Sequence, residues 1–177
     1  CGHKDVHGIT LTGSTAVGVQ TAKAGAEHLA HVTLELGGND AFIVLNDADI
    51  SLSVDQAMGG RMSNNGQICC APKRFLIHKD VKAAFTQELV KRVSALKRGD
   101  PADPDSQISC LISEKAAQEV EWQVSHTIAQ GATLLCGGKR EGSYYAPTIL
   151  TDVTPDMDVA KNLEIFGPVV PIIEISN

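Results

Sequence analysis

Apolar positions along the chain alternate between short continuous runs and segments with helical spacing. Runs rich in Val, Ile, Leu and Phe indicate buried strands, predicted at residues 8–12, 32–36, 41–45, 74–78, 133–136 and 169–175. Apolar residues three and four positions apart indicate helices, predicted at residues 14–27, 50–62, 81–96 and 113–130. Alternating strands and helices are typical of helices packed on a largely parallel sheet, so the predicted fold class is α/β.

The turn at Gly37 and Gly38 is the best candidate for a domain boundary, because a Rossmann-like strand, helix and strand unit would end there. The chain also starts at Cys1, only a few residues ahead of its first predicted strand. Domains rarely begin so abruptly, and we therefore expect this sequence to be a piece of a longer protein.

Composition excludes several classes of function. A hydrophobic fraction of 43% among 177 residues is ordinary, and no apolar stretch approaches the length of a membrane span. The formal charge of -6 leaves no basic stripe for nucleic acid. Five cysteines form neither a disulfide framework nor a pair of CxxC knuckles, which argues against structural zinc and fits reduced thiols in a cytoplasmic protein.

The segment from Gly13 to Gly18 lies between a predicted strand and a predicted helix. Backbone N–H groups and the helix dipole at such a place favour an anion such as a pyrophosphate. An ordinary tight turn with a serine or threonine helix cap explains the same residues about equally well.

Glu35 lies near the end of a predicted strand, just before two glycines that allow another group close to the backbone. Flanking leucines indicate a half-buried setting, which suits a carboxylate acting as general base near neutral pH. An outward-facing glutamate on an alternating strand is the plain alternative.

Cys69 and Cys70 follow a run of turn-forming residues, which predicts a loop. A cysteine thiolate near backbone N–H groups is a good nucleophile, although a pair of small buried hydrophobic residues is the commoner situation for cysteine. The six histidines are scattered and show no catalytic spacing to a cysteine, so a papain-like hydrolase is not supported.

Glu164 and Phe166 stand two residues apart before a rigid Gly-Pro turn, so in an extended segment their side chains share a face. The carboxylate can accept hydrogen bonds from a ribose diol, and the ring can lie against a flat heterocycle. A core phenylalanine at the start of a strand is the alternative, and it is favoured for this motif in isolation.

Four motifs occur in one order: LTGSTAVG at 11–18, LELGGN at 34–39, GQIC at 66–69 and EIFGPV at 164–169. Together they closely resemble the signature set of the aldehyde dehydrogenase superfamily, across nearly the whole chain. The resemblance implies that residues 1–37 are the C-terminal remnant of a nucleotide-binding domain and that residues 38–177 are the catalytic domain. It also implies a longer parent protein that forms a homo-oligomer, a dimer or a tetramer.

The resemblance implies a role for each matching position. Cys69 would be the nucleophile that attacks an aldehyde, and Glu35 would activate the water that hydrolyses the resulting thioester. Hydride would pass to NAD or NADP, between which the sequence does not decide. The residues implied to contact this cofactor are Thr12, Gly13, Ser14, Gly18, Leu36, Glu164 and Phe166.

One departure from the family pattern concerns the substrate, and two alternative functions remain. Ser63 stands where many succinate semialdehyde dehydrogenases carry an arginine, yet residues 71–75 (APKRF) resemble a branch that includes such enzymes, so succinate semialdehyde is one candidate substrate. Coenzyme A acylating relatives typically lack the glutamate found here at Glu35, which favours hydrolysis. A truncated domain that only binds or assembles is the non-enzymatic alternative, and the fragment alone is expected to be inactive or nearly so.

Overall fold

In the computed structural model, which describes residues 1–176, strand β1 (Gly8–Thr12) pairs in parallel with β2 (His31–Glu35). Helix α1 (Thr15–Ala26) connects the two strands. These elements belong to one compact unit, Cys1–Gly38, and the rest of the chain forms a second unit.

Close packing holds α1 against its two strands. A Cβ atom added to Gly25 would lie 2.6 Å from Val32 Cγ2, and one added to Gly18 would lie 2.8 Å from Leu36 Cδ2. The buried residues of this unit are Gly18, Gly25 and Thr21, all on α1. The unit therefore contains a helix–strand contact but no large apolar core of its own.

The second unit is built on a five-stranded sheet with strand order β3-β4-β9-β8-β5. The first four strands in this order run parallel and β5 is antiparallel to β8, so the prediction of a largely parallel α/β sheet is confirmed. The strands are β3 (Ala41–Val44), β4 (Arg74–His78), β5 (Thr133–Cys136), β8 (Thr148–Val153) and β9 (Val169–Ile175), and a separate pair is formed by β6 (Arg140–Glu141) and β7 (Tyr144–Tyr145).

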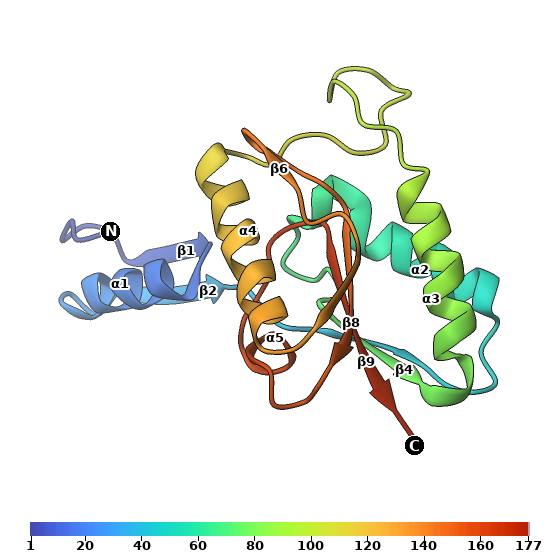
Figure 1. The fold of residues 1–177 in the computed structure, drawn as a ribbon. Helices are drawn as coiled ribbons and strands as arrows, with labels where there is room; N and C mark the ends of the chain where they lie inside the picture. The colour runs from blue at the N-terminus through green and yellow to red at the C-terminus, as the bar shows by residue number, and fades with distance from the viewer. Residues whose placement is uncertain (177) are drawn as a thin grey trace. The chain divides into compact units, whose positions relative to one another are not determined.

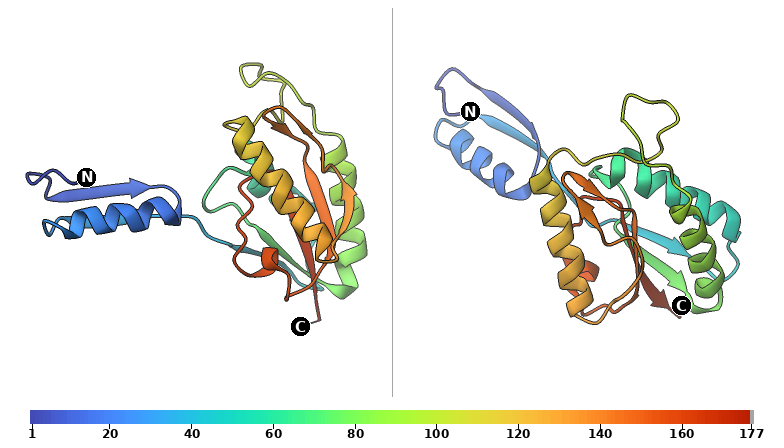
Figure 2. Two further views of the ribbon diagram at one scale, coloured as in Figure 1. Left: turned by 60° about the vertical axis from the view of Figure 1, so that its left-hand side comes forward. Right: turned by 45° about the horizontal axis from the view of Figure 1, so that its top comes forward.

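Helices cover both faces of this sheet (Figures 1 and 2). Helices α2 (Ile50–Met62) and α3 (Lys79–Ser94) pack on one face, and their apolar side chains share a core with β4. Helix α4 (Glu114–Ala129) and the short α5 (Asp158–Lys161) pack on the other face around a second core. Within residues 1–176 no helix combines the length and apolarity that a membrane span requires.

Helix starts follow from capping side chains. Asp49 Oδ1 accepts a hydrogen bond of 2.9 Å from Leu52 N at the start of α2, and Ser113 Oγ accepts one of 3.1 Å from Ala116 N at the start of α4. Helix α3 begins at Lys79, two residues before the predicted start, because the imidazole of His78 acts as its cap. Histidine is not among the residues that usually signal a helix start.

Strand β8 was not predicted from the sequence, although it lies between β9 and β5 in the sheet. Its segment contains two threonines and an aspartate, which dilute the apolar pattern of a buried strand. Thr148 is nevertheless fully buried, because its hydroxyl donates to Ala146 O at 2.7 Å and accepts from Gly138 N at 2.8 Å. Satisfied hydroxyl groups let a partly polar segment occupy the sheet interior.

Candidate functional site

The cysteine loop, defined here as residues 63–73, follows α2 and reverses the chain before β4. Asn64, Asn65 and Gly66 have positive φ angles of 48°, 55° and 73°. Asparagine and glycine tolerate this left-handed conformation better than other residues. Cys69 and Cys70 are exposed on this loop, so the predicted loop is confirmed and the alternative of a buried cysteine pair is contradicted. The role of Cys69 as nucleophile stays a prediction.

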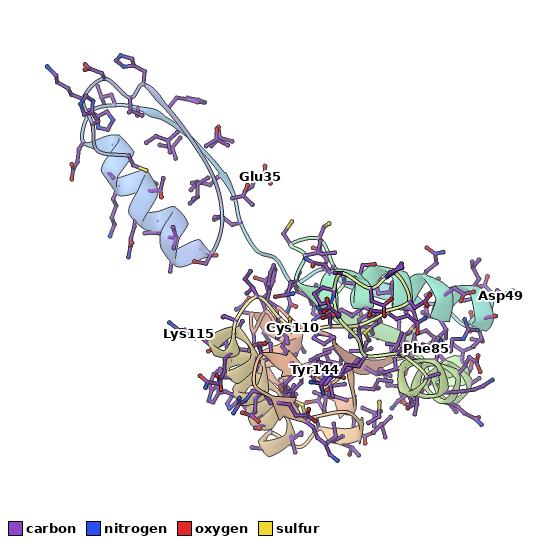
Figure 3. All side chains as sticks on the ribbon, turned by 90° about the horizontal axis from the view of Figure 1, so that it is seen from above. Glu35, Asp49, Phe85, Cys110, Lys115 and Tyr144 are labelled. Carbon is purple, nitrogen blue, oxygen red and sulfur yellow. The ribbon has the colours of Figure 1, made fainter. Side chains whose placement is uncertain are left out.

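Amide side chains attach the cysteine loop to the segment 109–112. The Asn65 side chain donates to Cys110 O at 2.8 Å and accepts from Ser109 N at 2.9 Å. Gln67 Oε1 accepts from Ile112 N at 2.9 Å. Cys110, which Figure 3 labels, thus belongs to a backbone segment that braces the loop.

A buried lysine braces the same loop from inside. The Lys73 side chain is only 1% exposed, and its Nζ donates to three backbone carbonyls of the loop. The same Nζ lies 3.3 Å from Glu164 Oε1, which links the loop to the segment 164–168. A buried ammonium group is tolerated because these acceptors replace water.

The 164–168 turn, which precedes β9, is fixed by a second buried cation. Arg61 is fully buried on α2, and its guanidinium donates to Ile165 O at 2.7 Å and to Val169 O at 2.6 Å. Burial lowers the pKa of Arg61 to about 9, and the negative charge of Glu164 partly opposes this shift. Arg61 remains protonated at neutral pH, so the bonds to the turn persist there.

Glu164 and Phe166 line one pocket of about 170 Å³, as expected for side chains that share a face. Ile165 between them is buried, while the ring of Phe166 is 44% exposed. Gln67 of the cysteine loop lines the same pocket. The pocket therefore joins the loop that carries Cys69 to a carboxylate and an exposed aromatic ring.

The remaining predicted site residues lie in the first unit. Thr12 and Glu35 are register partners at the ends of β1 and β2, and Gly13 N donates to Glu35 O at 3.0 Å. Ser14 Oγ caps α1 by accepting a hydrogen bond from Val17 N at 3.4 Å. The helix cap that was the alternative to an anion site in this segment is therefore present. The structure thus groups Thr12, Gly13, Ser14 and Glu35 at one end of the strand pair.

The half-buried setting expected for Glu35 is a wrong prediction for this chain. Glu35 is exposed, and Figure 3 shows its side chain projecting from β2. The alternation of β2 places Val32 and Leu34 on the partly buried side and Glu35 on the other side. Glu35 belongs to the first unit and Cys69 to the second.

Three side chains that shape the site were missed in the sequence: Arg61, Asn65 and Lys73. Each is a polar residue inside a segment read as helix or loop. The available signal for Lys73 was its place directly after Pro72 at the entrance of a buried strand, where a charged side chain needs partners. Arg61 lies at the end of a helix otherwise rich in small and apolar residues, which carries no comparable signal.

The site contains no cluster suited to a metal ion: within residues 1–176, no group of three or more His, Cys, Asp or Glu side chains could hold one. In the second unit, the carboxylate of Glu164 can bind a diol and Phe166 offers a flat exposed face. In the first unit, the N-terminus of α1 offers N–H groups to an anion.

The protein-family model described as "Aldehyde dehydrogenase family" matches residues 1–177. A succinate-semialdehyde dehydrogenase [NADP(+)] of Deinococcus radiodurans is 43% identical over 176 residues, covering 98% of this chain and 37% of the relative. A succinate semialdehyde dehydrogenase [NAD(P)+] of Escherichia coli is 44% identical over 167 residues, covering 93% of this chain and 36% of the relative.

Solved structures share the fold. A succinate-semialdehyde dehydrogenase from Burkholderia pseudomallei superposes with a TM-score of 0.94 at 40% identity, covering 99% of this chain and 37% of that one. A betaine aldehyde dehydrogenase from Staphylococcus aureus in complex with NAD+ superposes with a TM-score of 0.95 at 34% identity, covering 99% and 36%. The chain thus spans little more than a third of the length of these relatives.

Proposed function

Because the chain belongs to the aldehyde dehydrogenase family, we propose that it is the catalytic part of a longer NAD(P)-dependent enzyme that oxidises an aldehyde to a carboxylic acid. Residues 38–177 would be its catalytic domain and residues 1–37 the end of its nucleotide-binding domain. The observation that carries the proposal is the exposed Cys69 on a loop joined to the turn that holds Glu164 and Phe166.

The chemistry proposed for this chain begins at sulfur. The Cys69 thiolate attacks the aldehyde carbon, and the resulting oxyanion accepts a hydrogen bond from the Cys69 backbone N–H. Glu164 and Phe166 would hold a nicotinamide, and the chemistry that this group would supply is acceptance of the hydride from this carbon. Glu35 then takes a proton from the water that attacks the thioester, so that the acid is released and the Cys69 sulfur is free again.

The proposed cofactor contacts follow the two groups of residues described above. Ser14 and the N–H groups at the start of α1 would meet the pyrophosphate, with Gly13 keeping the approach open. Glu164 would hold the nicotinamide ribose, and the exposed ring of Phe166 would contact the nicotinamide. Gly18 and Leu36 pack against each other, so their proposed contribution is to the shape of this site.

Two named relatives oxidise succinate semialdehyde, which we propose as one candidate substrate. Ser63, six residues before Cys69, donates from Oγ to Gly59 O at 2.6 Å and offers no positive charge to a distant carboxylate. An aldehyde without that carboxylate is therefore an equal candidate. The homo-oligomeric state and the cytoplasmic location stay predictions.

Variants of the full-length enzyme test the proposal through the adjacent cysteines. Cys69→Ser should abolish NAD(P)H formation from an aldehyde, whereas Cys70→Ser should retain it, since both thiols are exposed on one loop but only Cys69 has the proposed role. Mass spectrometry of the products, with and without coenzyme A, should show the free acid in both cases. Full activity in Cys69→Ser would refute the proposal, and a coenzyme A thioester as product would favour the acylating alternative.

A further inference from the structure

Lys73, the last residue of the cysteine loop, makes three hydrogen bonds back to carbonyl groups of that loop. Its ammonium group donates to Ile68 O at 3.2 Å, to Cys69 O at 2.6 Å and to Ala71 O at 3.0 Å. An ammonium group has three N–H donors, so these three carbonyls use its full donor capacity. The fourth partner, Glu164, interacts with it as an opposite charge at 3.3 Å.

These contacts fix the orientation of two peptide groups that flank the nucleophile. In residues 1–176 every peptide bond is trans, so the C=O and the N–H of one peptide group point in opposite directions. Because Ile68 O points toward the Lys73 ammonium group, the Cys69 N–H of the same peptide group points away from Lys73. In the same way, the Cys70 N–H points away from Lys73 because Cys69 O points toward it. The Cys69 N–H is the group proposed above to stabilise the oxyanion.

The contact with Glu164 extends this control to the cofactor side. Glu164 is 28% exposed and lines the pocket with Phe166, whereas Lys73 is 1% exposed beneath the loop. Attraction between two charges is stronger at a buried partner than between two solvated side chains. One ammonium group thus joins the peptide that carries the oxyanion donor to the carboxylate proposed to bind ribose.

We propose that Lys73 is a positioning residue that orients the Cys69 N–H toward the reacting oxygen and holds the Glu164 carboxylate in a fixed position relative to that N–H. This inference rests on the proposed function. Lys73 touches neither the substrate nor the cofactor; it acts through the Ile68 carbonyl and through Glu164. Loss of its ammonium group should slow the step that builds negative charge on the aldehyde oxygen and, separately, weaken binding of the dinucleotide.

The test uses the full-length enzyme with Lys73→Met, which keeps a long side chain but removes the charge and all three donors. The rate constant of the hydride burst should fall about tenfold to a hundredfold, in line with loss of a well-aimed oxyanion donor, while KM for the aldehyde changes little. The affinity for NADPH or NADH, measured by nucleotide fluorescence, should also fall. Circular dichroism and thermal unfolding establish that the variant is folded.

A matched control is Lys82→Met. Lys82 is also partly buried and ion-paired, at 3.8 Å to Asp152 and 3.2 Å to Glu174, but it has no contact with the cysteine loop. Its burst and its cofactor affinity should equal those of the wild type. A loss of burst in Lys82→Met equal to that in Lys73→Met would overturn the proposal, because the effect would then be general destabilisation.

The effect of Lys73 on the hydride burst and its effect on dinucleotide affinity can be measured separately in an enzyme that already carries Glu164→Gln. There, adding Lys73→Met should cause little further loss of dinucleotide affinity, because the carboxylate partner is already gone, yet it should still slow the burst. Equal further losses in both quantities, or none in either, would contradict the proposal. If Lys73→Met does not fold, Lys73→Gln decides: a burst as fast as in the wild type overturns the proposal, and a roughly tenfold slower one supports it.

Failure of this inference is distinguishable from failure of the proposed function. If Cys69→Ser abolishes the burst while Lys73→Met leaves it within twofold of the wild type, only the role of Lys73 is lost. If Cys69→Ser itself retains the burst, the enzyme does not use Cys69 and both proposals fall.

Discussion

Gly66 and Gly167 approach so closely that a Cβ atom on Gly66 would overlap the carbonyl oxygen of Gly167. Gly66 belongs to the cysteine loop and Gly167 to the 164–168 turn, so backbone packs directly on backbone. Together with Arg61 and Lys73, this contact makes the loop and the turn one rigid assembly.

Gly66→Ala should therefore disrupt this assembly. The residue has a φ of +73°, a region that costs a residue with a side chain about 1–2 kcal/mol, and the added methyl group also requires the backbone of Gly167 to move. We expect a lower free energy of unfolding in urea and a slower hydride burst. Gly59→Ala is the control, and it should raise the free energy of unfolding. Nothing lies within 4 Å of the added Cβ, and alanine stabilises a helix interior by about 0.5–1 kcal/mol relative to glycine. Equal stability of the two variants would show that Gly66 tolerates a side chain.

Glu35→Gln should separate the two halves of the proposed reaction. Water activation follows hydride transfer, so stopped-flow absorbance should show a burst of NAD(P)H of nearly full amplitude and a much slower steady state. Asp40, an exposed acid just beyond the glycine turn, provides the control as Asp40→Asn, which should leave both phases unchanged. An unchanged steady-state rate in Glu35→Gln would remove the role assigned to this residue.

Ser63→Arg tests how the enzyme treats a distant carboxylate on its substrate. If succinate semialdehyde binds with that group near Ser63, an added guanidinium should lower KM for it about tenfold or more, because a charge-assisted hydrogen bond contributes roughly 1.5–3 kcal/mol. KM for an uncharged aldehyde such as propanal should stay the same, which serves as the internal control. An equal change of KM for both aldehydes would mean that Ser63 lies away from the substrate carboxylate.

Tyr145 should make stability depend on alkaline pH. Burial raises the pKa of Tyr145 to about 12, from about 10 in an unfolded chain. The folded state thus disfavours the phenolate, so the contribution of Tyr145 is fully present below pH 10 and is lost as the pH rises from 10 through 12. A shift of this size corresponds to about 2–3 kcal/mol. Urea unfolding between pH 9 and pH 11.5 should show a steeper loss of stability in the wild type than in Tyr145→Phe, and parallel curves would contradict the assignment.

The sequence was most informative where one pattern decides one element. Four of the six predicted strands have the observed bounds, namely β1, β4, β5 and β9, and the other two, β2 and β3, differ from the prediction by one residue. Strand β8 escaped because its buried threonines look polar until the hydroxyl partners are known. One partner, Gly138, lies ten residues earlier in the chain, and the other, Ala146, has to be oriented by the bend before the strand. The apolar pattern of the segment shows neither hydrogen bond.

The candidate site divided in the same way. Cys69, Glu164 and Phe166 were singled out from motif spacing and loop chemistry, and their roles stay predictions. The structure leaves Cys69 exposed and places Glu164 and Phe166 on one pocket. Arg61 was missed because its carbonyl acceptors are more than 100 residues away in the sequence. Lys73 was missed because its nearby carbonyl acceptors depend on the conformation of the cysteine loop, and its ionic partner Glu164 is distant in the sequence. The exposure of Glu35 was misjudged because flanking leucines were taken as evidence for burial of the residue between them, whereas strand alternation places them on the other side.

Neighbouring residues of β9 serve different layers of the second unit: Val169 and Ile173 belong to the core under α4, whereas Val170 and Ile172 belong to the core under α2 and α3. Inserting or deleting one residue in this strand would exchange its two faces, because side chains alternate with a period of two. Such a shift would turn Val170 and Ile172 away from the core under α2 and α3, although neither side chain itself would have changed.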